Sequence, residues 1–176
     1  IYYVPLAYNE QGFDKQICRH FKLDDITPDL NRWISIAHDY ENPEGEITIA
    51  IVGKYTSLQD SYKSLSEAIT HGGIANKLRV KVEWIDSELF ETDNDDILTH
   101  YLADVSGLLV PGGFGKRGSE GKINAIRFAR QRHIPFLGIC FGMQMAVLES
   151  ARTLGYLPNA SSSEFGDGGD LLVGLM

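Results

Sequence analysis

The chain has 176 residues, 43% of them hydrophobic, which is enough to bury the core of one α/β domain and part of a second. Its formal net charge of −8 and the lack of a long lysine/arginine run argue against a general nucleic-acid-binding protein. No stretch reaches the roughly 18 consecutive apolar residues of a membrane span, and the start lacks the basic region of a signal peptide. We therefore expect a cytoplasmic protein with no membrane or nucleic-acid partner.

The first 45 residues differ from the rest. Residues 2–6 are apolar and predict an extended segment, and apolar spacing over 14–23 predicts a helix. Pro28 suits the first turn of a second helix, and the polar, Pro- and Gly-containing residues 41–46 predict a linker. We expect one domain to end at residue 45 and another to occupy 46–176.

Strand and helix patterns alternate from residue 46 onward. Strands are expected at 47–52, 78–85, 107–110 and 134–138, and helices at 60–70 (stopped by His71-Gly72-Gly73), 94–102, 121–132 and 143–149. This order predicts an α/β fold with a doubly wound, mostly parallel sheet and helices on both faces. The serine- and glycine-rich stretch after residue 160 predicts loops.

A cysteine lies between two glycines where the last predicted strand meets a helix. Gly138-Ile-Cys140-Phe-Gly142 has the pattern of a nucleophile elbow, in which a strained turn holds the nucleophile at the end of the sheet. The following helix N-terminus favours the thiolate over the thiol. Most buried cysteines are inert, but the two glycines and the strand-to-helix context make Cys140 a candidate nucleophile. The other cysteine, Cys18, has a different context, and we expect two free thiols.

A glycine-rich loop follows the preceding predicted strand. Pro111-Gly-Gly-Phe-Gly-Lys-Arg-Gly118 can turn backbone N–H groups toward a ligand, and beside Cys140 these could hold an oxyanion together with the N–H of Phe141. The loop lacks the GxxxxGK[ST] pattern of a phosphate-binding Walker loop. It contains GxGxxG, but no acidic residue ends the next strand, which disfavours dinucleotide binding.

These two motifs make the sequence similar to a known family. Residues 107–118 and 134–144 resemble the class I (triad) glutamine amidotransferases, and within that class the CTP synthase family. Residues 49–55, 159–165 and the leading segment (Tyr3–Leu6, Gln11–Asp14) support the narrower resemblance, which therefore spans nearly the whole chain. The leading segment resembles the tail of that family's synthetase domain.

The resemblance implies a role for each matching residue. Cys140 would attack the side-chain amide of L-glutamine, forming a glutamyl thioester and releasing ammonia. The N–H groups of Gly113 and Phe141 would form the oxyanion hole; the family usually has leucine in place of Phe141, which should be tolerated because the main chain donates. Glutamine would be held by the segment that follows the nucleophile and by Glu164, with Glu164 on the α-ammonium group: Phe141, Gly142, Met143, Gln144 and Glu164.

The resemblance also implies ligands and partners. Phe114 and Arg117 lie in a loop that resembles the family's lid for GTP, an allosteric activator, whereas Arg117 could equally be a solvated charge. The family is a ligase of pyrimidine biosynthesis that uses the ammonia for ATP-dependent amination of UTP to CTP. No cofactor or metal site is expected in this segment; ATP, UTP and Mg²⁺ would bind the synthetase domain of the same chain, and a homo-oligomer, a tetramer in the family, is implied.

The catalytic base is the missing part of the pattern. All five histidines precede Cys140, whereas elbow enzymes place the base after the nucleophile. The family's histidine and glutamate lie further downstream. We therefore expect a fragment of a longer enzyme, inactive alone.

Three other interpretations stay open. A glutaminase of another triad amidotransferase, such as a GMP synthetase type, would share the elbow but not the leading segment. A non-catalytic regulatory or assembly module could use the same fold. A DJ-1-like cysteine sensor is a further possibility, against which the glycine-rich loop argues.

Overall fold

A four-stranded sheet organises the computed structural model, which describes residues 1–23, 27–54, 59–92, 94–166 and 168–174. The strands have the order β2-β1-β3-β4 and comprise β1 (Gly45–Gly53), β2 (Leu78–Asp86), β3 (Gly107–Val110) and β4 (Phe136–Gly138). β3 runs parallel to both β1 and β4, with Leu109 opposite Ile51 and Leu137. The α/β prediction with a mostly parallel sheet is confirmed.

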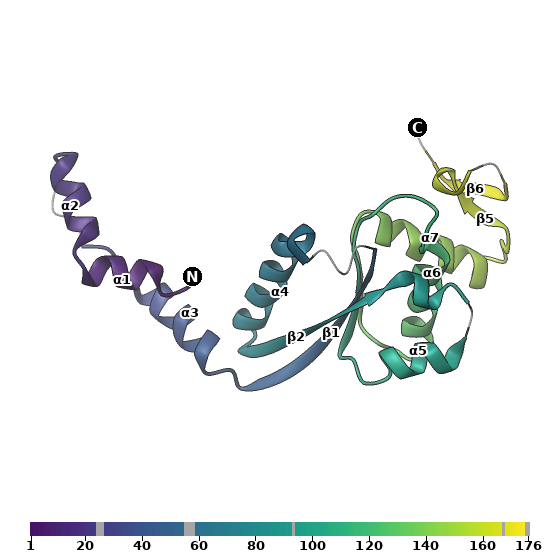
Figure 1. The fold of residues 1–176 in the computed structure, drawn as a ribbon, viewed down its shortest axis with the longest axis horizontal. Helices are drawn as coiled ribbons and strands as arrows, with labels where there is room; N and C mark the ends of the chain where they lie inside the picture. The colour runs from purple at the N-terminus through teal and green to yellow at the C-terminus, as the bar shows by residue number, and fades with distance from the viewer. Residues whose placement is uncertain (24–26, 55–58, 93, 167, 175–176) are drawn as a thin grey trace. The chain divides into compact units, whose positions relative to one another are not determined.

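Seven α-helices and three short 3-10 helices are described between and around the strands (Figure 1). The α-helices are α1 (Val4–Glu10), α2 (Phe13–His20), α3 (Asn31–Glu41), α4 (Lys63–Ala75), α5 (Asp95–Leu102), α6 (Ser119–Gln131) and α7 (Phe141–Thr153). The 3-10 helices are η1 (Gln59–Tyr62), η2 (Ser87–Phe90) and η3 (Ser163–Phe165). Residues 24–26 of the predicted turn and Tyr55 of the 49–55 motif lie outside the described residues.

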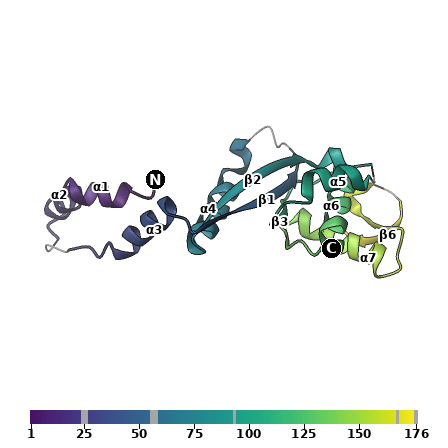
Figure 2. The ribbon, with the colours of Figure 1, turned by 90° about the horizontal axis from the view of Figure 1, so that it is seen from below.

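The chain divides into two compact units. One contains residues 1–46 and 67–80, and the other contains 47–66 and 81–176. The unit of 47–66 and 81–176 holds the large apolar core, where the carboxyl half of β1, all of β3 and the inner faces of α5, α6 and α7 bury their side chains. In both views α5, α6 and α7 gather beside one another (Figures 1 and 2). The predicted domain boundary after residue 45 stays a prediction.

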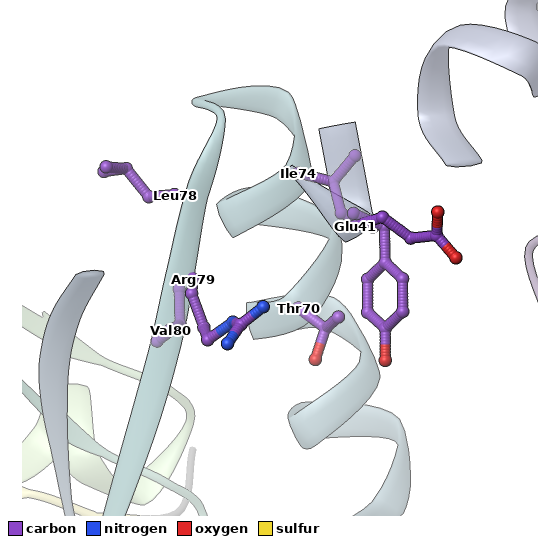
Figure 3. Close-up of a pocket in the computed structure, with 7 residues that line it drawn as sticks. Glu41, Thr70, Ile74, Leu78, Arg79 and Val80 are labelled. Carbon is purple, nitrogen blue, oxygen red and sulfur yellow. The ribbon is translucent and has the colours of Figure 1, made fainter. Parts of the chain in front are cut away.

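The unit of residues 1–46 and 67–80 corrects one expectation. Residues 2–6 are not extended, because α1 begins at Val4. Pro5 fits there, since the first helical turn needs no backbone N–H from it. Tyr2 packs against Tyr40 with ring centroids 4.8 Å apart. A hollow of about 400 Å³ opens between α3, α4 and β2, with Glu41, Thr70 and Arg79 on its wall (Figure 3).

Helix α4 continues past its predicted stop. Instead of ending at His71-Gly72-Gly73, it runs to Ala75. Gly73 is needed inside the helix because a methyl group there would lie only 2.6 Å from the Leu78 carbonyl oxygen at the start of β2. The glycine that was expected to end the helix therefore allows close helix–strand packing.

The tail is more ordered than the sequence suggested. Instead of loops alone, β5 (Ala160–Ser162) and β6 (Asp170–Val173) form a two-stranded sheet beside α7. β4 is an edge strand of the main sheet with Leu137 58% exposed, in contrast to the fully buried β3. Within the described part of the chain, every helix is too short or too polar to cross a bilayer.

Candidate active site

Cys140 sits on a sharp turn between β4 and α7. Its backbone has φ +53° and ψ −109°, a left-handed conformation that costs a non-glycine residue about 1–3 kcal/mol. The thiol is exposed, and α7 begins at the next residue, Phe141. The first N–H groups of a helix have no partner inside it, so the Phe141 N–H stands at the helix end beside the thiol-bearing residue. This is the geometry of a nucleophile elbow.

The two flanking glycines are required by close backbone packing. A methyl group on Gly142 would lie 1.9 Å from the Val110 carbonyl oxygen of β3, and one on Gly138 would lie 2.7 Å from the Gly142 carbonyl carbon. The same β3 carbonyl accepts a hydrogen bond from the Ile139 N–H at 2.9 Å. The turn is therefore pressed against the end of β3, where no side chain fits.

The glycine-rich loop meets the elbow at the carboxyl edge of the sheet. A methyl group on Gly112 would lie 3.6 Å from Cβ and 4.0 Å from Sγ of Cys140. The next residue, Gly113, has φ +137°, which only glycine adopts readily. In the sheet order β2-β1-β3-β4 the chain moves from β1 outward to β2 and from β3 outward to β4, in opposite directions. The carboxyl ends of β1 and β3 are therefore the switch point where ligands bind in doubly wound sheets. The structure thus brings Gly113 and Cys140 together.

Glu164 reaches the same loop from η3. Its Oε2 accepts a hydrogen bond from the Gly115 N–H at 3.1 Å, although 49 residues separate the two in sequence. The carboxylate is exposed, so it remains accessible to a ligand. The η3 turn that carries it begins with Ser162, whose hydroxyl accepts from the Glu164 N–H.

The other predicted residues lie around this centre. Met143 is 55% exposed on the first turn of α7, Gln144 is half-buried, and Gly142 is buried. The Phe114 ring is 55% exposed and packs against the Phe141 ring with centroids 5.4 Å apart. Arg117 forms an ion pair with Glu88 at 2.5 Å, and because both side chains are exposed, the two interpretations of Arg117 stay predictions.

Two buried lysines support the loop, and the sequence analysis missed both. Lys54, 3% exposed after β1, donates to the carbonyl oxygens of Phe114 and Gly115 at 2.8 and 2.9 Å. Lys122, fully buried in the first turn of α6, donates to the Gly113 carbonyl oxygen at 3.3 Å. A signal was available, because Lys122 occupies the same helical stripe as the buried Ile126 and Ala129.

The lysines have lowered proton affinity. Burial, and secondarily the neighbouring Lys54 ammonium, lowers the pKa of Lys122 to about 8. Burial also lowers the pKa of Lys54, with Arg117 adding to this and Glu164 opposing it. These groups form a positive cluster beneath the glycine-rich loop.

The histidines have other neighbours. Within the described residues, no hydrogen bond or ion pair joins a histidine to the Cys140 thiol. Each histidine has other neighbours: Phe21 for His20, Asp39 for His38, Tyr2 and Glu67 for His71, Tyr101 for His100, and the turn before β4 for His133. Residues 1–23, 27–54, 59–92, 94–166 and 168–174 also hold no group of three or more His, Cys, Asp and Glu side chains suited to a metal ion.

A comparison with known families shows which family the chain belongs to. The sequence profile of the class I glutamine amidotransferases matches residues 57–170, which include the glycine-rich loop, the elbow and Glu164. The chain belongs to this family. The elbow, the loop and Glu164 thus lie inside the matched region, and their roles as nucleophile, oxyanion and substrate-binding segments stay predictions.

Individual relatives narrow the family. The chain is 60% identical to the CTP synthase of Acidiphilium cryptum and 61% identical to that of Rhodospirillum rubrum, in each case over 100% of this chain and 32% of the relative. It thus spans about a third of the length of these relatives. The solved glutaminase domain of Trypanosoma brucei CTPS, with bound acivicin, has a TM-score of 0.63 and 40% identity over 68% of this chain and 46% of that one. The resemblance to CTP synthase is confirmed.

Proposed function

We propose that this chain is the glutaminase part of a glutamine-hydrolysing CTP synthase. The Cys140 thiolate attacks the side-chain amide carbon of L-glutamine, the amide oxygen becomes an oxyanion, and the amide nitrogen leaves as ammonia after protonation. Water then hydrolyses the glutamyl thioester to glutamate. The observation that carries the proposal is the close approach of the strained Cys140 turn to Gly112, which puts Cys140 beside the glycine-rich loop.

The oxyanion is stabilised by two backbone donors in this proposal. Gly113 supplies one N–H from the loop, and Phe141 supplies the other from the end of α7. Donors of this kind are typically worth about 100- to 1,000-fold in rate each, since they are aimed in advance at the developing charge. The proton of the thiol goes to a histidine held by a glutamate, both contributed by protein beyond these 176 residues.

The substrate is held along the start of α7 and by Glu164. The exposed carboxylate of Glu164 is suited to the α-ammonium group of glutamine. Gly142, Met143 and Gln144, on the first turn of α7 directly after Cys140, are the proposed contacts for the rest of the substrate. The ammonia aminates UTP in a synthetase domain with ATP and Mg²⁺, in a cytoplasmic homo-oligomer.

GTP is the proposed activator. The exposed Phe114 ring offers a stacking surface for guanine. A hollow of about 990 Å³ is lined by later residues of the same loop, Lys116 and Arg117, and by Arg152, whose basic side chains are suited to phosphate, together with Glu91 and Glu120. Loss of GTP stimulation in Phe114→Ala, with unstimulated activity retained, is the expected result; unchanged stimulation contradicts this assignment.

A covalent label and an activity split test the proposed function. In the full-length protein, the glutamine analogue 6-diazo-5-oxonorleucine should add its mass to Cys140. Cys140→Ala should lower glutamine-dependent CTP formation about 10,000-fold or more, while ammonia-dependent formation persists. Cys18→Ala is the matched control, since Cys18 lies in α2 of the other unit, and it should retain both activities.

The alternatives give different results. A GMP synthetase type would label at Cys140 but form no CTP, and the identity to CTP synthases over the whole chain, leading segment included, disfavours it. A non-catalytic module would leave Cys140 unlabelled. A cysteine sensor would oxidise at Cys140 without turning over glutamine.

A further inference from the structure

One buried cation touches both residues that supply the proposed oxyanion donors. The Lys122 ammonium lies 3.3 Å from the Gly113 carbonyl oxygen and 5.0 Å from the centroid of the Phe141 ring. Gly113 and Phe141 come from different segments, the β3 loop and the start of α7. A single side chain from α6 therefore spans the two halves of the hole.

Lys122 occupies a position that disfavours a positive charge. Its side chain is fully buried, it sits in the first turn of α6 where the helix dipole is positive, and Lys54 lies nearby. No carboxylate lies within ion-pair distance of its ammonium among the described residues. Stability alone does not account for this lysine, because methionine of similar length would fill the same space without a charge.

The loop geometry shows what the buried cations do. The carbonyl oxygens of Gly113, Phe114 and Gly115 all accept hydrogen bonds from lysine ammonium groups. Successive carbonyls of an extended chain point in alternate directions, and the positive φ angles of Gly113 (+137°) and Gly115 (+98°) remove that alternation. The carbonyls are held toward the lysines, which leaves the N–H of Gly115 to donate to Glu164.

We infer that Lys122 is a positioning residue for glutamine hydrolysis, which fixes the Gly113 peptide through its carbonyl and the Phe141 turn through the aromatic ring. It also places a positive charge behind the loop where negative charge develops in the transition state. The aromatic ring matters to this inference because a leucine at position 141 would provide the same N–H but no surface for the cation. The inference rests on the proposed function.

The titration of the Lys122 ammonium should be visible in the pH dependence of glutamine hydrolysis. The pKa of Lys122 is about 8, and the charged group that faces it is Lys54, itself next to Arg117 and Glu164. Above this pH the ammonium loses its charge, so its hold on the carbonyl and the ring weakens. We expect glutamine-dependent kcat to fall on the alkaline side with an apparent pKa near this value.

Lys122→Met in the full-length protein is the main test. We expect glutamine-dependent kcat to fall about tenfold, with KM little changed, ammonia-dependent CTP formation unchanged and the alkaline fall absent. Lys81→Met removes an exposed lysine from β2 and should leave every measurement as in the parent. Parental kcat and pH profile in Lys122→Met would overturn the inference, as would equal losses with glutamine and ammonia.

A double-mutant cycle tests the contact with the ring. Phe141→Leu should shift the alkaline fall to lower pH, because the neutral form of Lys122 gains relative to the charged form. The double variant should be no slower than Lys122→Met alone, whereas independent effects would multiply and contradict the inference. Failure of the proposed function is recognised separately: glutamine hydrolysis that survives Cys140→Ala refutes that proposal whatever Lys122 variants do.

Discussion

The elbow and the glycine-rich loop lie side by side at one sheet edge, yet different forces hold them. The elbow is fixed by its own backbone, since Gly138 and Gly142 press against neighbouring peptides with no room for a methyl group. The loop is fixed from outside, by Lys54 and Lys122 on its carbonyls and Glu164 on an N–H. One half of the site is thus specified by local sequence and the other by side chains from distant segments.

The largest effect is expected where the backbone leaves no space. Gly142→Ala would put a methyl group 1.9 Å from the Val110 carbonyl oxygen, so β3 and α7 must move apart. We expect a loss of more than about 3 kcal/mol in the free energy of unfolding and loss of Cys140 labelling. Urea unfolding and labelling by 6-diazo-5-oxonorleucine measure both effects.

Gly72→Ala is the matched control for the elbow substitution. Gly72 lies inside α4 with open space around its Cα, and alanine there should stabilise the helix by about 0.5–1 kcal/mol. If Gly142→Ala lowered the free energy of unfolding no more than Gly72→Ala, the elbow would not be held by backbone packing and would not differ from the loop in this way.

A smaller effect is expected at the contact between α6 and α7, the helices that follow the glycine-rich loop and the elbow. Arg130 of α6 donates to Glu149 of α7 through Nε at 3.1 Å and Nη2 at 2.8 Å, and Glu149 is 1% exposed. Arg130→Met leaves a buried carboxylate whose remaining partner, among the residues that the structure describes, is the Thr153 hydroxyl. We expect a loss of about 3 kcal/mol in the free energy of unfolding, measured by urea titration.

An exposed pair provides the comparison for Arg130. Lys77 and Glu44 form an ion pair with both side chains more than half exposed, so Lys77→Met should leave the urea midpoint unchanged. Equal effects of the two substitutions would mean that burial of Glu149 contributes nothing to the α6–α7 contact.

The smallest change in the free energy of unfolding is expected for Lys122, which supports the loop, and this substitution should stabilise the protein. At pH 7 folded protein carries Lys122 as a buried cation, so Lys122→Met should increase the free energy of unfolding by about 1–3 kcal/mol. Between pH 8 and 10.5 the folded lysine is neutral while the unfolded one is still protonated, so the parent gains stability as pH rises. The difference between the two proteins should therefore narrow across this range.

Thermal unfolding of both proteins from pH 7 to 10 measures this effect. A variant less stable than its parent at pH 7 would show that Lys122 supports the fold rather than the loop. Lys122 would then stabilise the fold as the packed glycines of the elbow do, and the elbow and the loop would not differ in this respect.

The same contrast explains what the sequence could predict. The elbow was visible because glycine, cysteine and glycine at fixed spacing produce the turn themselves, and the α/β pattern followed from the periodicity around it. Lys54 and Lys122 were not visible as loop supports, because their acceptors lie about 60 and 9 residues away and are backbone atoms. The length of α4 differs from the prediction for a related reason, since Gly73 is required by close packing against β2 and does not end its own helix.

Cys140 itself has a conformation that suits glycine better. Replacement by glycine would relieve backbone strain of about 1–3 kcal/mol, offset by about 1 kcal/mol of chain entropy in the unfolded state. Selection for stability alone would therefore favour glycine over cysteine at this position. The proposed role of Cys140 as the nucleophile explains why a cysteine occupies this strained position.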